Sequence, residues 1–338
     1  MSENLEWSLL GVIEPGVKPQ IGLMDTPFSQ AQLAEIQALA EAQGYDLLPL
    51  EADTIYPPEM LRNCEILCGY FPKKLLKNAV RLRWLQLPSA GADKYVDAAI
   101  YPHPGVTLTN SSGAFGSAIA EQLLMGALML LRRMPEYQAQ QRDHVWRRAG
   151  ALRFLRGSTV TVLGTGDLGG TFAGDCAALG ATVRGVSRSG KADRDCFSAV
   201  YPVDRMLEAV AEADIVAACL PLTKETEGLI DRRVFAAMKP GAIFLSVGRG
   251  RTVVQGDLTE ALRSGRLAGA MLDVAEVEPM PPDCPLWDLE NVIITPHVSG
   301  SDRDAPNAAE IFNIFMDNLR RYFAGEPLCN IVDKQKGY

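Results

Sequence analysis

Three polar side chains of chemically useful types occur in the second half of the sequence, each following a run that predicts a β-strand. They are Arg249 in Val-Gly-Arg-Gly, Glu278 in Leu-Asp-Val-Ala-Glu-Val-Glu-Pro and His297 in Thr-Pro-His-Val-Ser-Gly. In a parallel α/β sheet the carboxyl ends of the strands face one edge, so these side chains could converge there. A histidine can exchange a proton near neutral pH. Taken singly, each also fits a plain structural role: a surface turn, a solvated carboxylate and a hydrogen-bonded histidine.

A glycine-rich stretch, residues 157–190, is the element best suited to position this chemistry. Its β-branched and apolar run 159–163 predicts a buried parallel strand. A helix over 167–179, ended by Gly180, and a second strand over 182–186 follow. The order strand, turn, helix, strand is the context that gives a glycine motif at the turn its meaning.

The turn itself carries G-x-G-x-x-G, with glycines at 164, 166 and 169. The first permits the tight turn, the second lets the backbone approach a pyrophosphate, and the third lets the helix pack close to the strand. We therefore expect a dinucleotide here, with a purely structural glycine turn as the alternative. The residues assigned to the cofactor in this turn are Gly164, Gly166, Asp167, Leu168 and Gly169.

The end of the second predicted strand indicates which dinucleotide binds. NAD enzymes usually place Asp or Glu there to bind the ribose 2′-hydroxyl. This chain has Ser187, Arg188 and Ser189, with Lys191 just beyond, and no carboxylate before Asp193. A guanidinium beside hydroxyls suits a phosphate, which favours NADPH over NADH. The alternative is a solvated arginine after a strand.

Composition bounds the kinds of partner. The chain has 338 residues, 47% hydrophobic and 22% charged, with a net charge of −8. The negative charge argues against nucleic acid and anionic membranes as partners. Seven scattered cysteines without C-x-x-C or metal spacing fit a reducing cytoplasm and no metal site. We expect no signal peptide, because Glu3 and Glu6 stand where one would be basic, and no membrane span, because the apolar run 118–131 is too short.

The pattern along the chain predicts an α/β protein with two doubly wound parallel sheets. Residues up to about 109 alternate strands with helices, including a helix that Ser29 caps and Gly44 ends. Strands are expected at 45–50, 65–69, 84–87 and 106–108, and in the second half at 159–163, 182–186, 214–219, 242–247, 267–273 and 291–295. A final helix from Asp302 to Phe323 has no strand after it, so we expect it to return to the first domain.

The predicted domains are therefore 1–109 plus 300–338, and an inserted dinucleotide-binding domain, 110–299. A long apolar helix is expected near 117–131, followed by a polar segment, 135–148, read as an exposed loop or a dimer contact. In the first domain, small residues at 87–95 could expose backbone N–H groups to a carboxylate or could form a simple turn.

Together these motifs resemble the D-isomer-specific 2-hydroxyacid dehydrogenases. The likeness rests on Gly-Thr-Gly-Asp-Leu-Gly, Val-Gly-Arg-Gly, Leu-Asp-Val-Ala-Glu-Val-Glu-Pro and Thr-Pro-His-Val-Ser-Gly, supported by Ser-Ala-Gly-Ala-Asp and Pro-Leu-Thr-Lys-Glu-Thr. It covers nearly the whole chain. The resemblance implies a Rossmann cofactor domain inserted in a flavodoxin-like substrate domain, and a homodimer. Ser-Arg-Ser after the second strand is similar to the NADPH-dependent glyoxylate/hydroxypyruvate reductases of that family.

Roles in the reaction are implied by the resemblance. Arg249 would bind the carboxylate and keto oxygen of a 2-keto acid, His297 would protonate the keto oxygen, and Glu278 would hold the other imidazole nitrogen and favour the charged ring. Backbone N–H groups at the small-residue loop would bind the substrate carboxylate. Apart from the resemblance, Tyr70 and Phe71 follow a predicted first-domain strand and could line the pocket. The substrate residues are Ala90, Gly91, Ala92, Arg249 and Tyr70.

Further cofactor contacts are implied in the same way. Asp273 would contact the nicotinamide amide, and the loop after the strand at 214–219 would contribute Leu220, Pro221 and Thr226. Apart from the resemblance, Trp146 in the polar segment could reach a partner subunit.

The resulting expectation is an enzyme that reduces a small 2-keto acid, such as glyoxylate or hydroxypyruvate, to the D-2-hydroxy acid with NADPH. The chain ends soon after the last helix, so we expect no regulatory domain of the phosphoglycerate dehydrogenase kind. Two other functions remain open: an NAD-dependent dehydrogenase for a larger 2-hydroxy acid, and a nucleotide-sensing corepressor.

Overall fold

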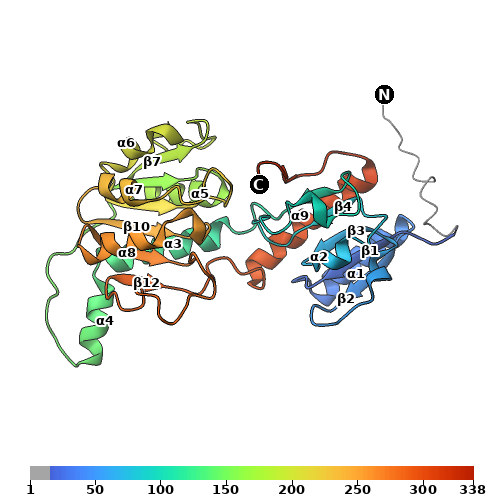
Figure 1. The fold of residues 1–338 in the computed structure, drawn as a ribbon, viewed down its shortest axis with the longest axis horizontal. Coiled ribbons are helices and arrows are strands. Elements are labelled where there is room, and N and C mark those ends of the chain that lie inside the picture. The colour runs from blue at the N-terminus through green and yellow to red at the C-terminus, as the bar shows by residue number, and fades with distance from the viewer. Residues whose placement is uncertain (1–15) are drawn as a thin grey trace. The chain divides into compact units, whose positions relative to one another are not determined.

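The computed structural model describes residues 16–338 and divides the chain into two compact units. The expectation about Glu3 and Glu6 falls outside the described residues. One unit combines the residues up to Ala114 with Asp302–Tyr338, and the other is Phe115–Ser301. The chain therefore leaves the first unit once and returns to it once, as the colours of Figure 1 show. The limits expected from the sequence, 110 and 299, lie a few residues from these.

The first unit contains a five-stranded parallel sheet in the order β2-β1-β3-β4-β5. This order is that of flavodoxin-like folds. The strands are β1 Gln20–Met24, β2 Asp46–Leu50, β3 Cys64–Gly69, β4 Trp84–Gln86 and β5 Thr107–Thr109. The helices and 3₁₀ turns of the unit are α1 Gln30–Ala42, η2 Pro58–Leu61, α2 Lys73–Leu76, η3 Ala98–Ile100 and α9 Ala305–Ala324.

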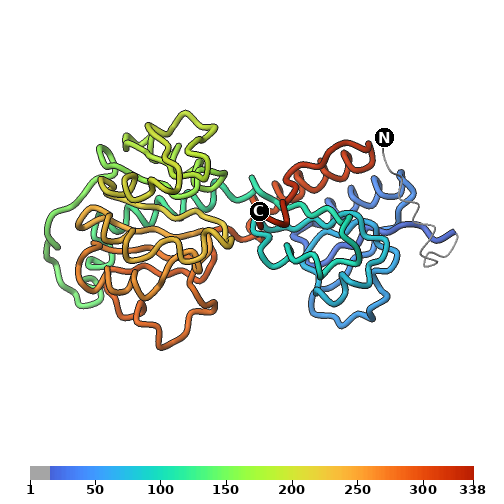
Figure 2. Tube along the Cα trace, turned by 45° about the horizontal axis from the view of Figure 1, so that its top comes forward, coloured from blue at the N-terminus to red at the C-terminus, as the bar shows by residue number. Residues whose placement is uncertain are grey.

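Helix α9 completes the first unit from the far end of the chain. Phe315 and Leu319 of α9 are fully buried against Ile21, Ile66 and Trp84 of the sheet. Figure 2 shows this red helix running along the blue N-terminal segments of the same unit. The expected return of the last helix is therefore observed, although the helix begins at Ala305 and not at Asp302.

The second unit contains a seven-stranded parallel sheet in the order β12-β11-β10-β9-β6-β7-β8. Its six strands from β8 to β11 have the 3-2-1-4-5-6 order of dinucleotide-binding folds, with β12 added at one edge. The predicted fold class, two doubly wound parallel sheets, is confirmed. The strands are β6 Thr159–Leu163, β7 Thr182–Ser187, β8 Ala199–Pro202, β9 Ile215–Ala218, β10 Ala242–Ser246, β11 Leu267–Leu272 and β12 Val292–Ile294.

Helices cover both faces of this sheet. On one face α3 and α5 pack together and against β6, β10 and β11. On the other, α6, α7 and α8 bury Val210, Phe235 and Leu258 against Phe244 and Leu272 of the sheet. The helices and 3₁₀ turns are α3 Gly116–Leu131, α4 Met134–Arg142, α5 Asp167–Ala178, η4 Val203–Arg205, α6 Met206–Val210, α7 Arg232–Ala237, η5 Gly250–Thr252 and α8 Gln255–Arg263.

The segment expected as an exposed loop, 135–148, is helical in its first part. Helix α4 begins at Met134 with Pro135 in its first turn, where proline fits because its missing N–H has no helical partner in any case. No residue of α4 is buried. In Figure 1 α4 and the chain after it stand away from the sheet of their unit.

Candidate active site

His297 and Glu278 form the pair that the sequence predicts. The imidazole Nδ1 lies 2.8 Å from Oε2 of Glu278. The other carboxylate oxygen, Oε1, accepts the N–H of Ala275 at 3.0 Å, so the carboxylate is fixed at both oxygens. A carboxylate only accepts hydrogen bonds, so Nδ1 carries the proton of this contact and Nε2 is left for another group. Both side chains are partly exposed, at 46% for His297 and 37% for Glu278.

The backbone that carries His297 is held in an unusual conformation. His297 has φ of +54°, a left-handed value that is uncommon for a residue other than glycine. Its N–H donates to the carbonyl of Asp273 at 2.8 Å. Backbone strain of this kind persists where the surroundings determine it, and it is frequent at active sites.

Asp273 supplies those surroundings. Its carboxylate is 1% exposed and accepts from Thr295 Oγ1, the N–H of Val298, and both the N–H and the hydroxyl of Ser299. Each oxygen thus receives two hydrogen bonds from the loop that contains His297. These four hydrogen bonds brace the His297 loop. The contact of Asp273 with the nicotinamide amide stays a prediction.

Arg249 lies between Gly248 and Gly250, whose missing side chains leave room for the backbone of neighbouring loops. A Cβ at Gly248 would lie 2.4 Å from the carbonyl oxygen of Leu220, and a Cβ at Gly250 would lie 1.9 Å from that of Ala275. Since Ala275 also donates to Glu278, the turn of Arg249 is in direct contact with the loop that holds the Glu278–His297 pair. Arg249 is half-buried, and its Nη1 donates to the carbonyl of Gly248 at 3.1 Å.

The glycines of the predicted cofactor turn have three distinct surroundings. A Cβ at Gly164 would lie 2.8 Å from the carbonyl oxygen of Cys219, and one at Gly169 would lie 1.9 Å from that of Gly164. A Cβ at Gly166 would meet nothing within 4 Å. Among the described residues, no hydrogen bond uses the N–H of Gly166, Asp167 or Leu168, at the start of α5. An open backbone with free donors at a helix N-terminus fits a pyrophosphate.

This turn lies where the strand order reverses, between β6 and β9. The loop after β9 folds on itself: Thr226 Oγ1 donates to the carbonyl of Pro221 at 2.6 Å and accepts the N–H of Thr223. Leu220 is buried and belongs to the hydrophobic core of the second unit. In this structure Thr226 therefore shapes the loop that the sequence assigned to the cofactor.

The residues after β7 form a tight turn. Ser187 Oγ donates to the carbonyl of Lys191 at 2.8 Å and accepts its N–H at 3.1 Å. Arg188 lies near the loop after β9: the hydroxyl of Thr223 and, more weakly, the charge of Arg188 lower the pKa of Glu225. Ser187 thus fixes the turn that presents Arg188 and Ser189.

The small-residue loop of the first unit has unused donors. The carbonyl of Ala90 accepts from Asn110 Nδ2 at 2.7 Å, and that of Gly91 accepts from Ser89 Oγ at 2.8 Å. Within residues 16–338, no hydrogen bond uses the N–H of Ala90, Gly91 or Ala92. Satisfied carbonyls beside free N–H groups are what a carboxylate site needs.

Tyr70 follows β3 at the same edge of that sheet. Its hydroxyl donates to Asp302 Oδ2 at 3.1 Å. Burial, followed by the charge of Asp302, raises the pKa of Tyr70, so the phenol stays protonated. Asp302 is a partner that no sequence motif indicated, because it lies 232 positions from Tyr70 along the chain.

A pocket of about 440 Å³ lies beside the Glu278–His297 pair in the second unit. Besides Glu278 and His297, its walls include Met280, Trp287 and Ile294. Trp287 is half-exposed and is held by a hydrogen bond from Nε1 to the carbonyl of Pro281 at 2.9 Å. Neither Met280 nor Trp287 is predicted from the sequence, since an apolar side chain in a loop gives no signal of a pocket.

Comparison with known proteins agrees with this geometry. The model of the D-isomer specific 2-hydroxyacid dehydrogenase NAD binding domain matches residues 124–299. Glyoxylate/hydroxypyruvate reductase A of Serratia proteamaculans is 31% identical over 79% of this chain and 85% of its own length. D-3-phosphoglycerate dehydrogenase of Archaeoglobus fulgidus is also 31% identical, but the chain spans only 49% of its length.

Comparison with solved structures indicates the same family. A D-isomer specific 2-hydroxyacid dehydrogenase from Xanthobacter autotrophicus Py2, in complex with NADPH and MES, has a TM-score of 0.81 and 32% identity, covering 95% of this chain and 99% of that one. The NADPH-dependent glyoxylate/hydroxypyruvate reductase of Sinorhizobium meliloti, in complex with NADP and sulfate, has a TM-score of 0.80 and 29% identity, covering 95% and 100%.

The chain therefore belongs to the D-isomer specific 2-hydroxyacid dehydrogenase family of NAD(P)-dependent oxidoreductases.

Proposed function

We propose that the protein reduces a small 2-keto acid, of the size of glyoxylate or hydroxypyruvate, to the D-2-hydroxy acid with NADPH. The observation that carries the proposal is the 2.8 Å contact between His297 Nδ1 and Glu278, beside the turn of Arg249, in a dinucleotide-binding fold. A histidine with one nitrogen held by a carboxylate is a positioned general acid.

Each residue of the proposed active site has its own role in the reaction. The reduced nicotinamide, when bound, supplies the hydride. His297 donates the Nε2 proton to the keto oxygen, and Glu278 stabilises the positive ring before the proton leaves. Arg249 orients the substrate, since its planar guanidinium can bind the carboxylate and keto oxygens together. Asp273 keeps the His297 loop in place.

In the first unit, the free N–H groups of Ala90, Gly91 and Ala92 are proposed to bind the substrate carboxylate. Tyr70, held by Asp302, is proposed to line the substrate pocket. Small side chains in this loop support a short substrate.

The cofactor preference is proposed from Arg188 and Ser189 after β7. No acidic residue occupies this strand end to bind a ribose diol or repel a 2′-phosphate. The relatives that carry NADPH or NADP in their solved structures support this choice.

A substrate panel tests the proposal. Glyoxylate, hydroxypyruvate, pyruvate, and aromatic and branched 2-keto acids are assayed with NADPH and with NADH in parallel. We expect the highest kcat/KM for one of the short acids with NADPH. A strong preference for a large keto acid with NADH would favour the alternative dehydrogenase, and no turnover with any acid would favour a nucleotide-sensing corepressor.

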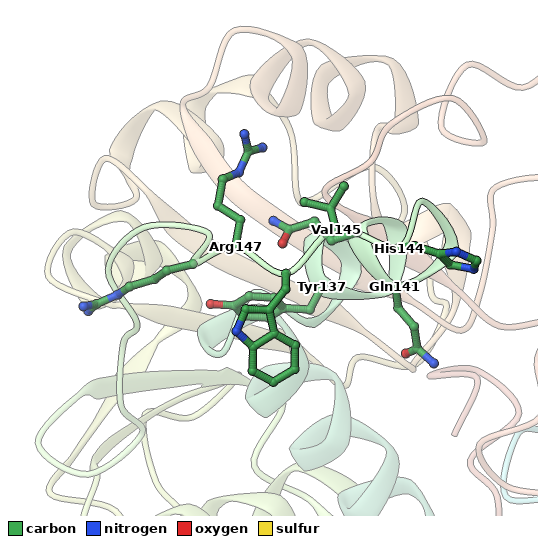
Figure 3. Close-up of a pocket in the computed structure, with 8 residues that line it drawn as sticks. Tyr137, Gln141, His144, Val145 and Arg147 are labelled. Atoms are coloured by element: carbon green, nitrogen blue, oxygen red, sulfur yellow. The ribbon is translucent and has the colours of Figure 1, made fainter.

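We also propose that the protein is a cytoplasmic homodimer in which the arm formed by residues 134–150 contacts a second copy. Trp146 of the arm is fully exposed and Val145 is 43% exposed. Tyr137, Gln141, His144 and Val145 surround a hollow of about 690 Å³ on this arm (Figure 3). An exposed tryptophan beside a hollow is typical of a surface that a partner covers.

The proposed compartment rests on the state of the cysteines. All seven cysteines are free, which fits a reducing environment. In the part of the chain that the structure describes, no helix is long and apolar enough to span a bilayer.

A further inference from the structure

Arg194 lies against the cofactor turn, although no motif includes it. It belongs to the connection between β7 and β8, six residues beyond Arg188. A Cβ at Gly170, in the first turns of α5, would lie 2.6 Å from Arg194 Nε and 2.7 Å from its Cδ. The absence of a side chain at Gly170 is therefore what lets the stem of Arg194 lie on the helix.

The guanidinium of Arg194 lies beside Asp167, the first residue of α5. Its Nη2 lies 3.7 Å from Oδ1 of Asp167. The Arg194 side chain is 44% exposed and that of Asp167 is 26% exposed, so the pair borders solvent. Asp167 stands directly after the open glycine of the turn, Gly166.

The position of Asp167 creates an electrostatic conflict. Its N–H is one of the free donors at the start of α5, where the cofactor pyrophosphate binds in this fold. Its side chain carries a negative charge within the same turn, and like charges close together repel. A cation beside the carboxylate removes this repulsion and adds an attraction of its own.

We propose that Arg194 is a cofactor-binding residue that contributes positive charge to the pyrophosphate site and is held there by Asp167 and by the gap at Gly170. The inference rests on cofactor binding at the glycine turn but not on the identity of the keto acid. Arg194 and Arg188 then have different targets. Arg188 faces the group that distinguishes NADPH from NADH, whereas Arg194 faces the pyrophosphate that both cofactors share.

The first test compares Arg194→Ala with the wild type. The dissociation constants of NADPH and NADH are measured by the fluorescence of the reduced nicotinamide, in the full-length protein, without substrate. We expect both constants to rise by roughly ten-fold, because a charge-assisted contact is lost at a half-exposed position. The ratio between the two cofactors should stay within about two-fold, and the difference from wild type should shrink as salt is added.

A second variant moves Arg194 without removing it. Gly170→Ala places a methyl group where the Arg194 stem lies, and alanine favours a helix more than glycine does. We expect weaker binding of both cofactors with no loss of thermal stability. Asp167→Asn in the Arg194→Ala background should recover part of the lost affinity, because the repulsive charge is removed. Arg321→Ala, which breaks an exposed ion pair of α9 in the other unit, is the matched control and should change neither constant.

The outcomes separate this inference from the proposed function. If the wild type binds neither cofactor, the proposed function itself fails. If the wild type binds and Arg194→Ala leaves both constants unchanged, or weakens NADPH alone, Arg194 does not serve the pyrophosphate and the inference is wrong.

Discussion

His297 is held at two separate points, its imidazole ring and its backbone N–H. Glu278 fixes the ring and Asp273 fixes the backbone, so replacement of the imidazole alone leaves the loop intact. We expect His297→Ala to lower kcat for keto-acid reduction by about 10²–10⁴-fold, the usual contribution of general acid catalysis. Steady-state assays give kcat, and nicotinamide fluorescence should show unchanged NADPH binding. Turnover close to the wild type would remove His297 from the mechanism.

Arg188 carries the predicted preference for NADPH. We expect Arg188→Ala to raise KM for NADPH by about 10- to 150-fold, the equivalent of 1.5–3 kcal/mol for a hydrogen bond to a charged group, and to leave NADH activity in place. Parallel kinetics with the two cofactors measure the ratio. Arg263→Ala, at the end of α8, removes the same charge at a distance from β7 and is the control. An unchanged ratio in Arg188→Ala would show that Arg188 is only a solvated residue.

At the scale of elements, Asp214 ties together the amino ends of the strands in the second unit. It accepts the N–H of Thr159 at 3.0 Å and Lys239 Nζ at 2.7 Å, and Arg153 lies 3.7 Å away. Burial alone would raise the pKa of this carboxyl. The hydrogen bonds from Lys239 and Thr159 and the charges of Lys239 and Arg153 outweigh burial and hold the pKa below its usual range.

The sign of the pH dependence follows from that direction. A carboxyl whose folded pKa lies below its unfolded value stabilises the fold above the unfolded value, near pH 4, and this contribution is lost as the pH falls further. We expect Asp214→Asn to lower the free energy of unfolding by about 1 kcal/mol at pH 7. Thermal unfolding between pH 7 and pH 3 should show the two proteins converging. A constant difference across this range would contradict the role of the charge.

Elements with strong local signals could be predicted from the sequence, and those without them could not. Ser29 and Gln32 form the capping box of α1, and β6 has the predicted bounds. Strand β1 was missed because its five residues have no local feature apart from their burial among neighbouring strands. Strand β8 was missed because all four of its residues are only partly buried at a sheet edge.

For the site, residue types and order along the chain were enough to indicate Arg249, Glu278 and His297. The bracing of the His297 loop by Asp273 could not be deduced, because the four donors lie in a loop more than 20 residues further on. Arg194 could not be identified from the sequence either, because only the packing of its aliphatic stem against Gly170 shows where its guanidinium lies.

At the scale of the whole molecule, the exposed arm of residues 134–150 leads us to predict a dimer. We expect size-exclusion chromatography with light scattering to give twice the chain mass of 36.7 kDa. Trp146→Ser combined with Val145→Ser should shift the equilibrium toward the monomer, because exposed apolar side chains gain most from a partner. Leu207→Ser, which changes an exposed leucine of α6 away from the arm, is the control. A wild-type monomer at micromolar concentration would contradict the proposed dimer.

The route of the chain through its two units has a consequence for synthesis on the ribosome. The sheet of the first unit is made early, but Phe315 and Leu319, which cover Ile21, Ile66 and Trp84, follow only after the whole of Phe115–Ser301. At about 5–20 residues per second, this insertion takes roughly 10–40 s to translate. During that interval a nascent chain exposes the apolar face that α9 later covers, and the inserted unit has all of its strands only once β12 is made near the end of the interval. The emerging first unit is therefore the part that we expect a ribosome-associated chaperone to bind.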